Sequence, residues 1–341
     1  MNQPSSIQLR FHRETAFFFA LVVFFFICIC GIIEILASQS WFFNIVPYPS
    51  PSIDSTFPEL DVKFQRLWKF GEPNCVFLGS SMTDTGLYPE VFEDLVNKKY
   101  KTNYRCFNMG FSSSMVEISA AVANSLTNWY DVDLIIWGIS PIDMDPNLVD
   151  TRRITDMPVF QYNNGNRSLI GYFYNQFRLP WFLASLPHLQ NSEYRGVLEN
   201  FNKSLDDRGM RRSDLKEPIN LDKVMLPDFE MNPDDFSAFQ KTVKNLKASG
   251  KKIIILEMPV HPTFLPFLVT GGNESYQDNF IGPVQKYLDS EGIQFIRTQD
   301  EISTIINMKS SWGNESHLNT EGAALFTRYV AQSCENLGSI P

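Results

Sequence analysis

The chain has few of the residues that hold metals or cofactors. Its 341 residues include only four histidines and five cysteines, and the cysteines lack the spacing of a zinc site. No phosphate-binding loop and no dinucleotide-binding glycine motif is present. The sequence therefore predicts neither a metal nor an organic cofactor.

Positive charge is also scarce. The chain has 29 Lys and Arg against 38 Asp and Glu, and its formal net charge is −9. Proteins that bind nucleic acid present a basic surface to the phosphates, so this charge argues against a nucleic-acid partner. Hydrophobic residues at 44% and charged residues at 20% are typical of a globular chain, with enough material for one large domain or two small ones.

A long apolar run lies near the N-terminus. Residues 16–33, AFFFALVVFFFICICGII, carry no charge. As a helix they would extend about 27 Å, close to the roughly 30 Å hydrocarbon core of a membrane. Arg10 and Arg13 precede the run, which favours a cytoplasmic N-terminus. We therefore expect a cytoplasmic segment at 1–14 and a transmembrane signal anchor at 15–37.

A cleaved signal peptide is the alternative for this segment, because Ala37 offers a weak cleavage point. The anchor is favoured because the run is long for the core of a signal peptide. The Pro- and Ser-rich residues that follow suggest a linker over 38–70. The remaining domain, 71–338, should then lie outside the cytoplasm.

Apolar strands and amphipathic helices alternate in the domain. The apolar runs predict strands at 75–79, 104–110, 132–138, 251–259 and 293–298, and helical spacing predicts helices at 87–100, 113–129, 232–250, 276–292 and 320–334. Such alternation implies right-handed crossovers and a mostly parallel five-stranded sheet with helices on both faces. The predicted fold is a three-layer α/β/α sandwich.

The alternation is interrupted at about 141–230, which we interpret as a long insertion. It contains many Pro, Asn and aromatic residues with little periodicity. The stretch 172–189, YFYNQFRLPWFLASLPHL, is aromatic enough to lie on a membrane or a partner. Packing within the insertion is the commoner explanation for such a stretch.

Three cysteines lie beyond the apolar run: Cys75, Cys106 and Cys334. Cys75 and Cys106 each stand four residues before a glycine that ends a predicted strand. A disulfide between them is conceivable if the two strands are neighbours. We expect two reduced, buried thiols instead.

A serine and a histidine stand at the ends of predicted strands. Residues 77–89, FLGSSMTDTGLYP, place Ser81 just after the first strand, and His317 lies in the loop before the last helix. Serines in such a loop often only form a turn. The alternative is a nucleophile at the carboxyl edge of the sheet, activated by an imidazole base.

Four short blocks resemble the SGNH (GDSL-like) hydrolases, in the order found in that family. They are GSS at 79–81, NMG at 108–110, WGIS at 137–140 and NESH at 314–317. The resemblance implies the flavodoxin-like SGNH fold, with Ser81 as nucleophile and His317 as base. It also implies an oxyanion hole formed by Ser81, Gly110 and Ser140.

Two positions depart from the family pattern. Ser140 stands where the family has an asparagine of the oxyanion hole, and Asn314 stands where it has the aspartate of the triad. Asn314 can accept a hydrogen bond from the imidazole but adds no charge. Asp84 and Glu315 are candidates to supply that charge. His261, after the fourth strand, either contacts substrate or is a loop residue without a role.

Two further stretches show a closer resemblance. GISPIDMD at 138–145 resembles a segment of the membrane-anchored D-alanyl transfer proteins of teichoic acid synthesis. HLNTEGAALFT at 317–327 resembles the ending of those proteins and of SGNH proteins in alginate O-acetylation. Those proteins work beside a membrane-bound O-acyltransferase (MBOAT). The resemblance implies an anchored acyltransferase or esterase that moves a small acyl group, acetyl above all, on a cell-surface glycan. A catalytically weakened scaffold that binds an MBOAT or a glycan is the alternative.

Overall fold

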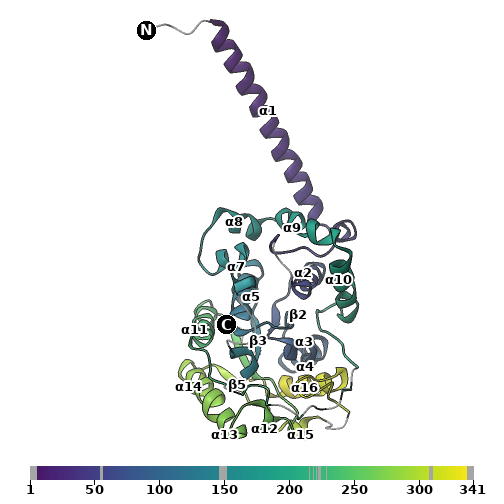
Figure 1. The fold of residues 1–341 in the computed structure, drawn as a ribbon, viewed down its shortest axis with the longest axis vertical. Helices are drawn as coiled ribbons and strands as arrows, with labels where there is room; N and C mark the ends of the chain where they lie inside the picture. Colours follow the sequence, from purple (N-terminus) through teal and green to yellow (C-terminus); the bar gives the residue numbers. More distant parts are fainter. Residues whose placement is uncertain are drawn as a thin grey trace.

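The computed structural model describes residues 6–53, 57–145, 152–214, 216–217, 219, 221, 224–227, 229–306 and 310–335, without the side chains of 6–14 and 152. Residues 1–5 of the predicted cytoplasmic segment and 336–338 of the predicted domain lie outside this description. Figure 1 shows a compact domain from which one long N-terminal helix projects.

A five-stranded parallel sheet forms the centre of the domain (Figure 1). Its order is β2 (Cys106–Asn108), β1 (Cys75–Leu78), β3 (Leu134–Ile139), β4 (Lys252–Glu257) and β5 (Gln294–Ile296), and each neighbouring pair is parallel. The first three strands along the chain are buried throughout, which explains their continuous apolar runs. The predicted α/β fold with a five-stranded sheet is confirmed.

Helices cover both faces of the sheet. Helices α4 (Pro89–Tyr100) and α16 (Thr320–Ser333) pack together on one face, and α5 (Val116–Trp129) and α11 (Pro233–Ala248) on the other (Figure 1). The strand order reverses direction at β1 and β3. In open parallel sheets ligands bind outside the carboxyl ends of the strands at such a switch point.

The helix boundaries follow local signals. Helix α11 begins where the Asn232 side chain accepts the N–H of Asp234, and Gly250, with a φ of +74°, follows its end. The helix predicted at 276–292 is a composite of α13 (Gly272–Tyr276), the π turn η3 (Gln277–Ile281) and α14 (Gly282–Glu291). Short helices occur at α3 (Ser81–Gly86), η2 (Pro141–Met144), α12 (Leu265–Leu268) and α15 (Ile302–Ile305).

Regular structure also occurs where the sequence predicted a linker and an irregular insertion. The predicted linker contains the 3₁₀ helix η1 (Ser40–Asn44) and helix α2 (Pro58–Phe70), whose apolar face enters the main core. The insertion contains α6 (Arg152–Thr155), α7 (Pro158–Asn163), α8 (Leu169–Gln176), α9 (Leu179–Gln190) and α10 (Ser192–Ser204). Helix α2 is thus a core element of the domain.

The projecting helix is α1 (Ser6–Ala37). Its segment Thr15–Ala37 has 23 residues and contains an 18-residue window with a mean hydropathy of 3.1. It is long and apolar enough to cross a membrane, and that window is not buried in the domain. By length and composition alone, a helix of this kind near the N-terminus can be a membrane span or a signal sequence.

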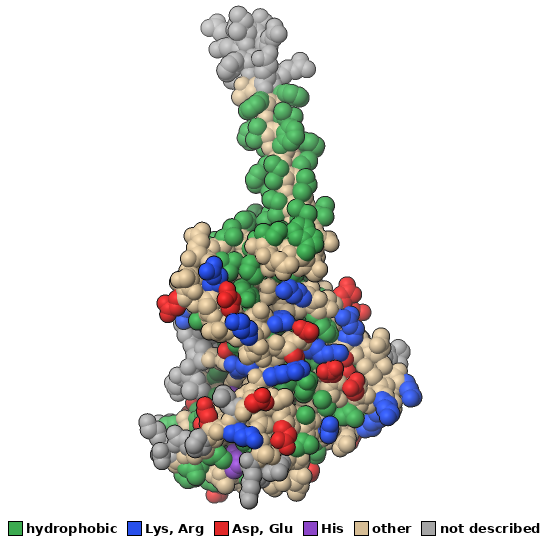
Figure 2. Space-filling model, turned by 90° about the vertical axis from the view of Figure 1, so that its right-hand side faces the viewer, with side chains coloured by type: hydrophobic (Ala, Val, Ile, Leu, Met, Phe, Trp, Pro, Cys, Tyr) green, Lys and Arg blue, Asp and Glu red, His purple; other side chains and the backbone are tan. Residues whose placement is uncertain are grey.

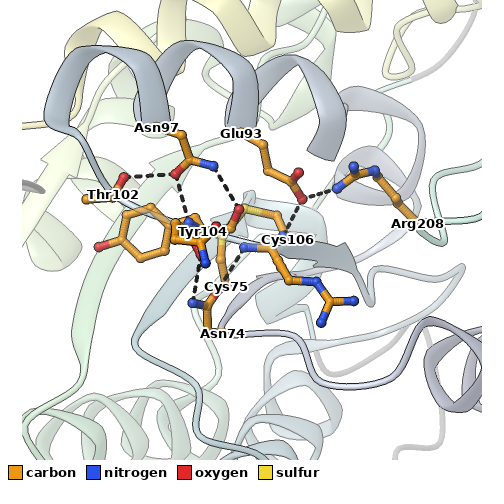
Figure 3. The surroundings of a disulfide bond; sticks show 10 residues. Asn74, Cys75, Glu93, Asn97, Thr102, Tyr104, Cys106 and Arg208 are labelled. Atoms are coloured by element: carbon orange, nitrogen blue, oxygen red, sulfur yellow. Dashed lines mark hydrogen bonds and ion pairs between the residues drawn. A yellow bond between two sulfur atoms is a disulfide. The ribbon is translucent and has the colours of Figure 1, made fainter.

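The expectation of two reduced thiols is wrong. Cys75 and Cys106 form a disulfide, shown with its surroundings in Figure 3. Strands β1 and β2 are neighbours, and their parallel register places the two cysteines directly opposite each other. The prediction failed because sequence alone did not establish that these strands were adjacent. Disulfides persist in oxidising compartments, so the bond is compatible with a domain outside the cytoplasm.

Candidate active site

Ser81 lies at the junction of strand β1 and helix α3, where it is the first helical residue. Gly79 makes this sharp turn possible, because its φ is +140° and a Cβ there would lie 2.3 Å from Thr83 Oγ1. The turn leaves Ser81 partly exposed at the carboxyl edge of the sheet. A helix N-terminus favours negative charge close to it.

The structure brings Ser81 and His317 together across 236 positions of sequence. Ser81 Oγ lies 2.8 Å from His317 Nε2, and His317 Nδ1 lies 2.9 Å from Asn314 Oδ1. Asn314 Oδ1 also accepts the backbone N–H groups of Ser316 at 3.0 Å and of His317 at 2.9 Å. An atom that accepts two backbone N–H groups is an oxygen, so His317 Nδ1 carries the proton that Asn314 accepts. Nε2 is then free to accept the proton of Ser81.

The loop before α16 is built to hold this imidazole. Trp312 and Leu318 form an antiparallel bridge, and the N–H of Gly313 donates to the carbonyl of His317 at 2.8 Å. Asn319 then caps α16 by accepting the N–H of Gly322. The imidazole is therefore held by backbone contacts on both sides of its own residue.

The surroundings of His317 favour its neutral form. Burial lowers its pKa below the ordinary 6.5, and the positive charge of Arg211 lowers it further. The negative charges of Asp84 and Glu315 act in the opposite direction and are weaker. Asp84 and Glu315 thus favour the protonated imidazole, as predicted, but their effect on the pKa is smaller than that of burial.

A cleft of about 680 Å³ opens over these groups. Ser81, His317 and Asn314 line it together with polar and charged side chains, among them Ser112, Arg211, Arg212 and Glu217. The residues that face the cleft are thus mostly polar.

A buried ion network lies behind Ser81. Lys63 and Asp84 are both fully buried and form an ion pair, and Arg211 Nε approaches the other carboxylate oxygen of Asp84 at 2.9 Å. Lys63 Nζ also donates to the carbonyls of Asn108 and Gly209. Burial lowers the pKa of Lys63, and the charge of Asp84 opposes that shift. Asp84 therefore joins α2, α3 and the segment around Arg211.

The residues predicted for the oxyanion hole have different surroundings. The N–H of Gly110 donates to Asn108 Oδ1 at 2.9 Å. Ser140, the N-cap of η2, is fully buried and does not line the cleft. Its N–H and hydroxyl both donate to Asp143 Oδ2. The structure therefore does not bring Ser140 to the catalytic groups. Ser81, at the start of α3, has its backbone N–H beside its own hydroxyl.

His261 lies behind the catalytic loop. Its ring packs edge-on against Trp312, its Nδ1 lies 2.7 Å from Thr263 Oγ1, and its backbone N–H donates to the carbonyl of Glu315. It does not line the cleft. These contacts give His261 a place in supporting the loop and do not place it against a substrate.

Sequence reasoning missed Lys63, Ser112 and Arg211. Arg211 donates to Ser112 Oγ at 3.1 Å and comes from a segment without regular periodicity. Lys63 stands in what was predicted to be a linker. A lysine on the apolar face of an amphipathic helix is a usable signal, since Leu60, Phe64 and Leu67 mark that face.

No described group of three or more His, Cys, Asp or Glu side chains is arranged to hold a metal ion.

Comparison with known proteins gives distant structural neighbours. No family model matches the chain, and no curated protein matches it. It is similar to a candidate acylhydrolase from Bacteroides fragilis NCTC 9343, at 10% identity and a TM-score of 0.37, covering 82% of this chain and 97% of that chain. It is also similar to the lipase Lip_vut3 from a goat rumen metagenome, at 12% identity and a TM-score of 0.32, covering 76% and 98%. At these values the likeness carries no functional conclusion.

Proposed function

We propose that this protein is a serine esterase or acyltransferase of the SGNH type. The observation that carries the proposal is the chain of contacts from Ser81 Oγ through the His317 ring to Asn314 Oδ1. A serine hydroxyl becomes a useful nucleophile when an oriented imidazole removes its proton. The four sequence blocks that resemble SGNH hydrolases support the same assignment.

The proposed reaction has two half-reactions. Ser81 Oγ attacks the carbonyl carbon of an ester while its proton moves to His317 Nε2. The tetrahedral intermediate collapses, the ester C–O bond breaks, and His317 returns the proton to the departing alkoxide. In the second half-reaction an alcohol or water loses its proton to His317 and attacks the acyl-serine. The product is a new ester or a free acid, and Ser81 regains its proton.

Asn314 orients the imidazole without adding charge. When His317 takes the proton of Ser81 it becomes an imidazolium, which Asn314 stabilises only through a neutral hydrogen bond. Asp84 and Glu315 add a longer-range contribution. We propose that the backbone N–H of Ser81 binds the developing oxyanion, with Gly110 joining when its N–H leaves Asn108 Oδ1.

The finer assignment concerns substrate and location. We propose that α1 anchors the chain in a membrane, with the domain on the outer side, and that the acyl group is an acetyl group moved on a cell-surface glycan. The hydrogen-bonding side chains that line the cleft, among them Ser112, Arg212 and Glu217, support a hydroxyl-rich acceptor. The stretches 138–145 and 317–327, which resemble proteins that work beside an MBOAT, support such a partner.

Two observations favour a second candidate, a scaffold that binds a glycan or an MBOAT without catalysis. Asn314 leaves the imidazolium without an adjacent charge, and Ser140 is buried where the resemblance implies an oxyanion donor. A scaffold without catalysis needs neither a charge beside the imidazole nor a donor for an oxyanion.

Hydrolysis of an aryl acetate by the purified wild type and two variants separates the two candidates. The wild type should release acetate, and Ser81→Ala should abolish release at an unchanged melting temperature, because losing one partly exposed hydroxyl leaves almost no cavity. Ser80→Ala is the matched control. Its side chain is buried and hydrogen-bonds Asp143, so its loss should affect activity less. Equal activity of the wild type and Ser81→Ala at equal stability would reject the enzyme.

A further inference from the structure

Exposed apolar side chains gather at one end of the domain. Outside α1, most of the described large apolar residues that are exposed belong to two segments, η1 with the residue after it, and α8 with α9. They are Trp41, Ile45, Leu169, Ile170, Tyr172, Phe173, Phe177, Leu183 and Leu186, here called the apolar end. Leu169 is 72% exposed and Ile170 is 63% exposed. Apolar surface of this extent marks a binding face.

Helix α9 of the apolar end is apolar on both sides, and helix α8 exposes Leu169, Ile170, Tyr172 and Phe173. Helix α9 buries Trp181, Phe182 and Ala184 in the domain, while Leu183 and Leu186 point outward. A surface helix in water normally carries polar residues on its outer face. The absence of that alternation explains why this segment showed no helical period in the sequence.

The apolar end is joined directly to α1. Glu34, near the end of α1, accepts the backbone N–H of Arg178 at 2.7 Å and of Leu179 at 2.8 Å, where α9 begins. Ala37 packs with Phe43 and Phe182 in a small core of its own. A carboxylate at a helix N-terminus is also favoured by the helix dipole. The end of α1 is therefore fastened to α9.

The figures show the same continuity. In Figure 1, α8 and α9 lie at the end of the domain that α1 enters. In Figure 2, hydrophobic side chains continue from α1 onto that end of the domain. A bilayer that surrounds Thr15–Ala37 would have its interface against η1, α8 and α9. Aromatic residues such as Trp41, Tyr172 and Phe173 are favoured in that layer.

We propose that the apolar end inserts into the interfacial layer of the membrane that α1 crosses, so that the domain rests on the bilayer. This inference rests on the proposed membrane crossing of α1. The lipid surface is the occupant that the structure favours, because the apolar end continues an apolar helix that is fastened to it. The domain would then keep one orientation relative to the membrane.

The test uses the full-length protein in phosphatidylcholine vesicles that contain lipid with a nitroxide on the acyl chain. Single cysteines carry an environment-sensitive fluorophore, in a background where the free cysteines Cys28, Cys30 and Cys334 are alanine. Ile170→Cys probes the apolar end, and Phe25→Cys probes α1. Lys286→Cys, exposed on α14 at the opposite end of the domain (Figure 1), is the control.

We expect the nitroxide to quench the probe at 170 several-fold more than the probe at 286, and to quench the probe at 25 most. Quenching at 25 without quenching at 170 would overturn the insertion and leave the anchor intact. Absence of quenching at both would reject the anchor and the insertion together. A probe at 170 that is shielded from water in native membranes but exposed to water in vesicles would indicate that a protein covers the apolar end. That result would overturn the lipid assignment.

Discussion

At the scale of single residues, Asn314 determines the tautomer and the orientation of the His317 ring. Its Oδ1 accepts one ring N–H and two backbone N–H groups, so an aspartate could accept the same three bonds. The pKa of His317 lies below 6.5 because of burial and the charge of Arg211. The imidazole of the folded protein therefore stays neutral, and able to act as a base, somewhat below pH 6.5. As the pH falls from 6.5 to this lower pKa, the unfolded chain binds a proton at His317 that the folded chain does not, so the free energy of unfolding decreases.

For aryl acetate hydrolysis we expect the acid limb of kcat/KM to have its midpoint below pH 6.5. Asn314→Asp should keep or raise the activity and move this midpoint to higher pH, because a carboxylate beside Nδ1 stabilises the imidazolium. Asn314→Ala should lower activity by about two to four powers of ten, as expected when a histidine loses its orienting partner. The pH–rate profiles of the three proteins provide the measurement. An acid limb unmoved by Asn314→Asp would mean that His317 is not the group that titrates.

At the scale of elements, the disulfide is the feature on which sequence and structure differ most sharply. It joins β2 to β1, the strand that directly precedes the turn to Ser81. A crosslink of this kind stabilises typically by about 2–4 kcal/mol. The double variant Cys75→Ala with Cys106→Ala should therefore melt at a lower temperature than the wild type.

Thiol titration of the unfolded, unreduced chain tests the same bond directly. The chain has five cysteines, and a disulfide leaves Cys28, Cys30 and Cys334, so three thiols should react. After reduction, five should react. Five reactive thiols before reduction would restore the expectation of two reduced cysteines.

The strands and the sheet could be predicted because each central strand is a continuous apolar run between turn residues. Ser81 and His317 could be placed at one edge because parallel strands share their carboxyl ends. The partner of Cys75 could not, because strand order depends on long-range packing. Arg211 lay beyond prediction for a different reason, since it reaches Asp84 from a segment that has neither strand nor helix periodicity.

At the scale of the whole molecule, the account requires the domain to lie outside the cytoplasm. Protease added to intact cells, or to spheroplasts where there is an outer membrane, should digest residues 38–341 and leave an N-terminal stub. The positive residues before the apolar run are the physical reason for this orientation. A cytoplasmic protein probed in the same sample should remain whole. Full protection of the domain in cells, with digestion after lysis, would show that the domain is cytoplasmic. That result would contradict the proposed topology and exclude a cell-surface glycan as substrate.

The central claim is that Ser81 is a nucleophile, and a fluorophosphonate probe tests it most directly. The probe forms a covalent bond only with an activated serine, and peptide mass spectrometry locates the adduct. The account predicts one adduct, on Ser81, that is absent from Ser81→Ala and strongly reduced in His317→Gln at unchanged melting temperatures. A folded wild-type protein that stays unlabelled, or one labelled at another serine, would contradict the account.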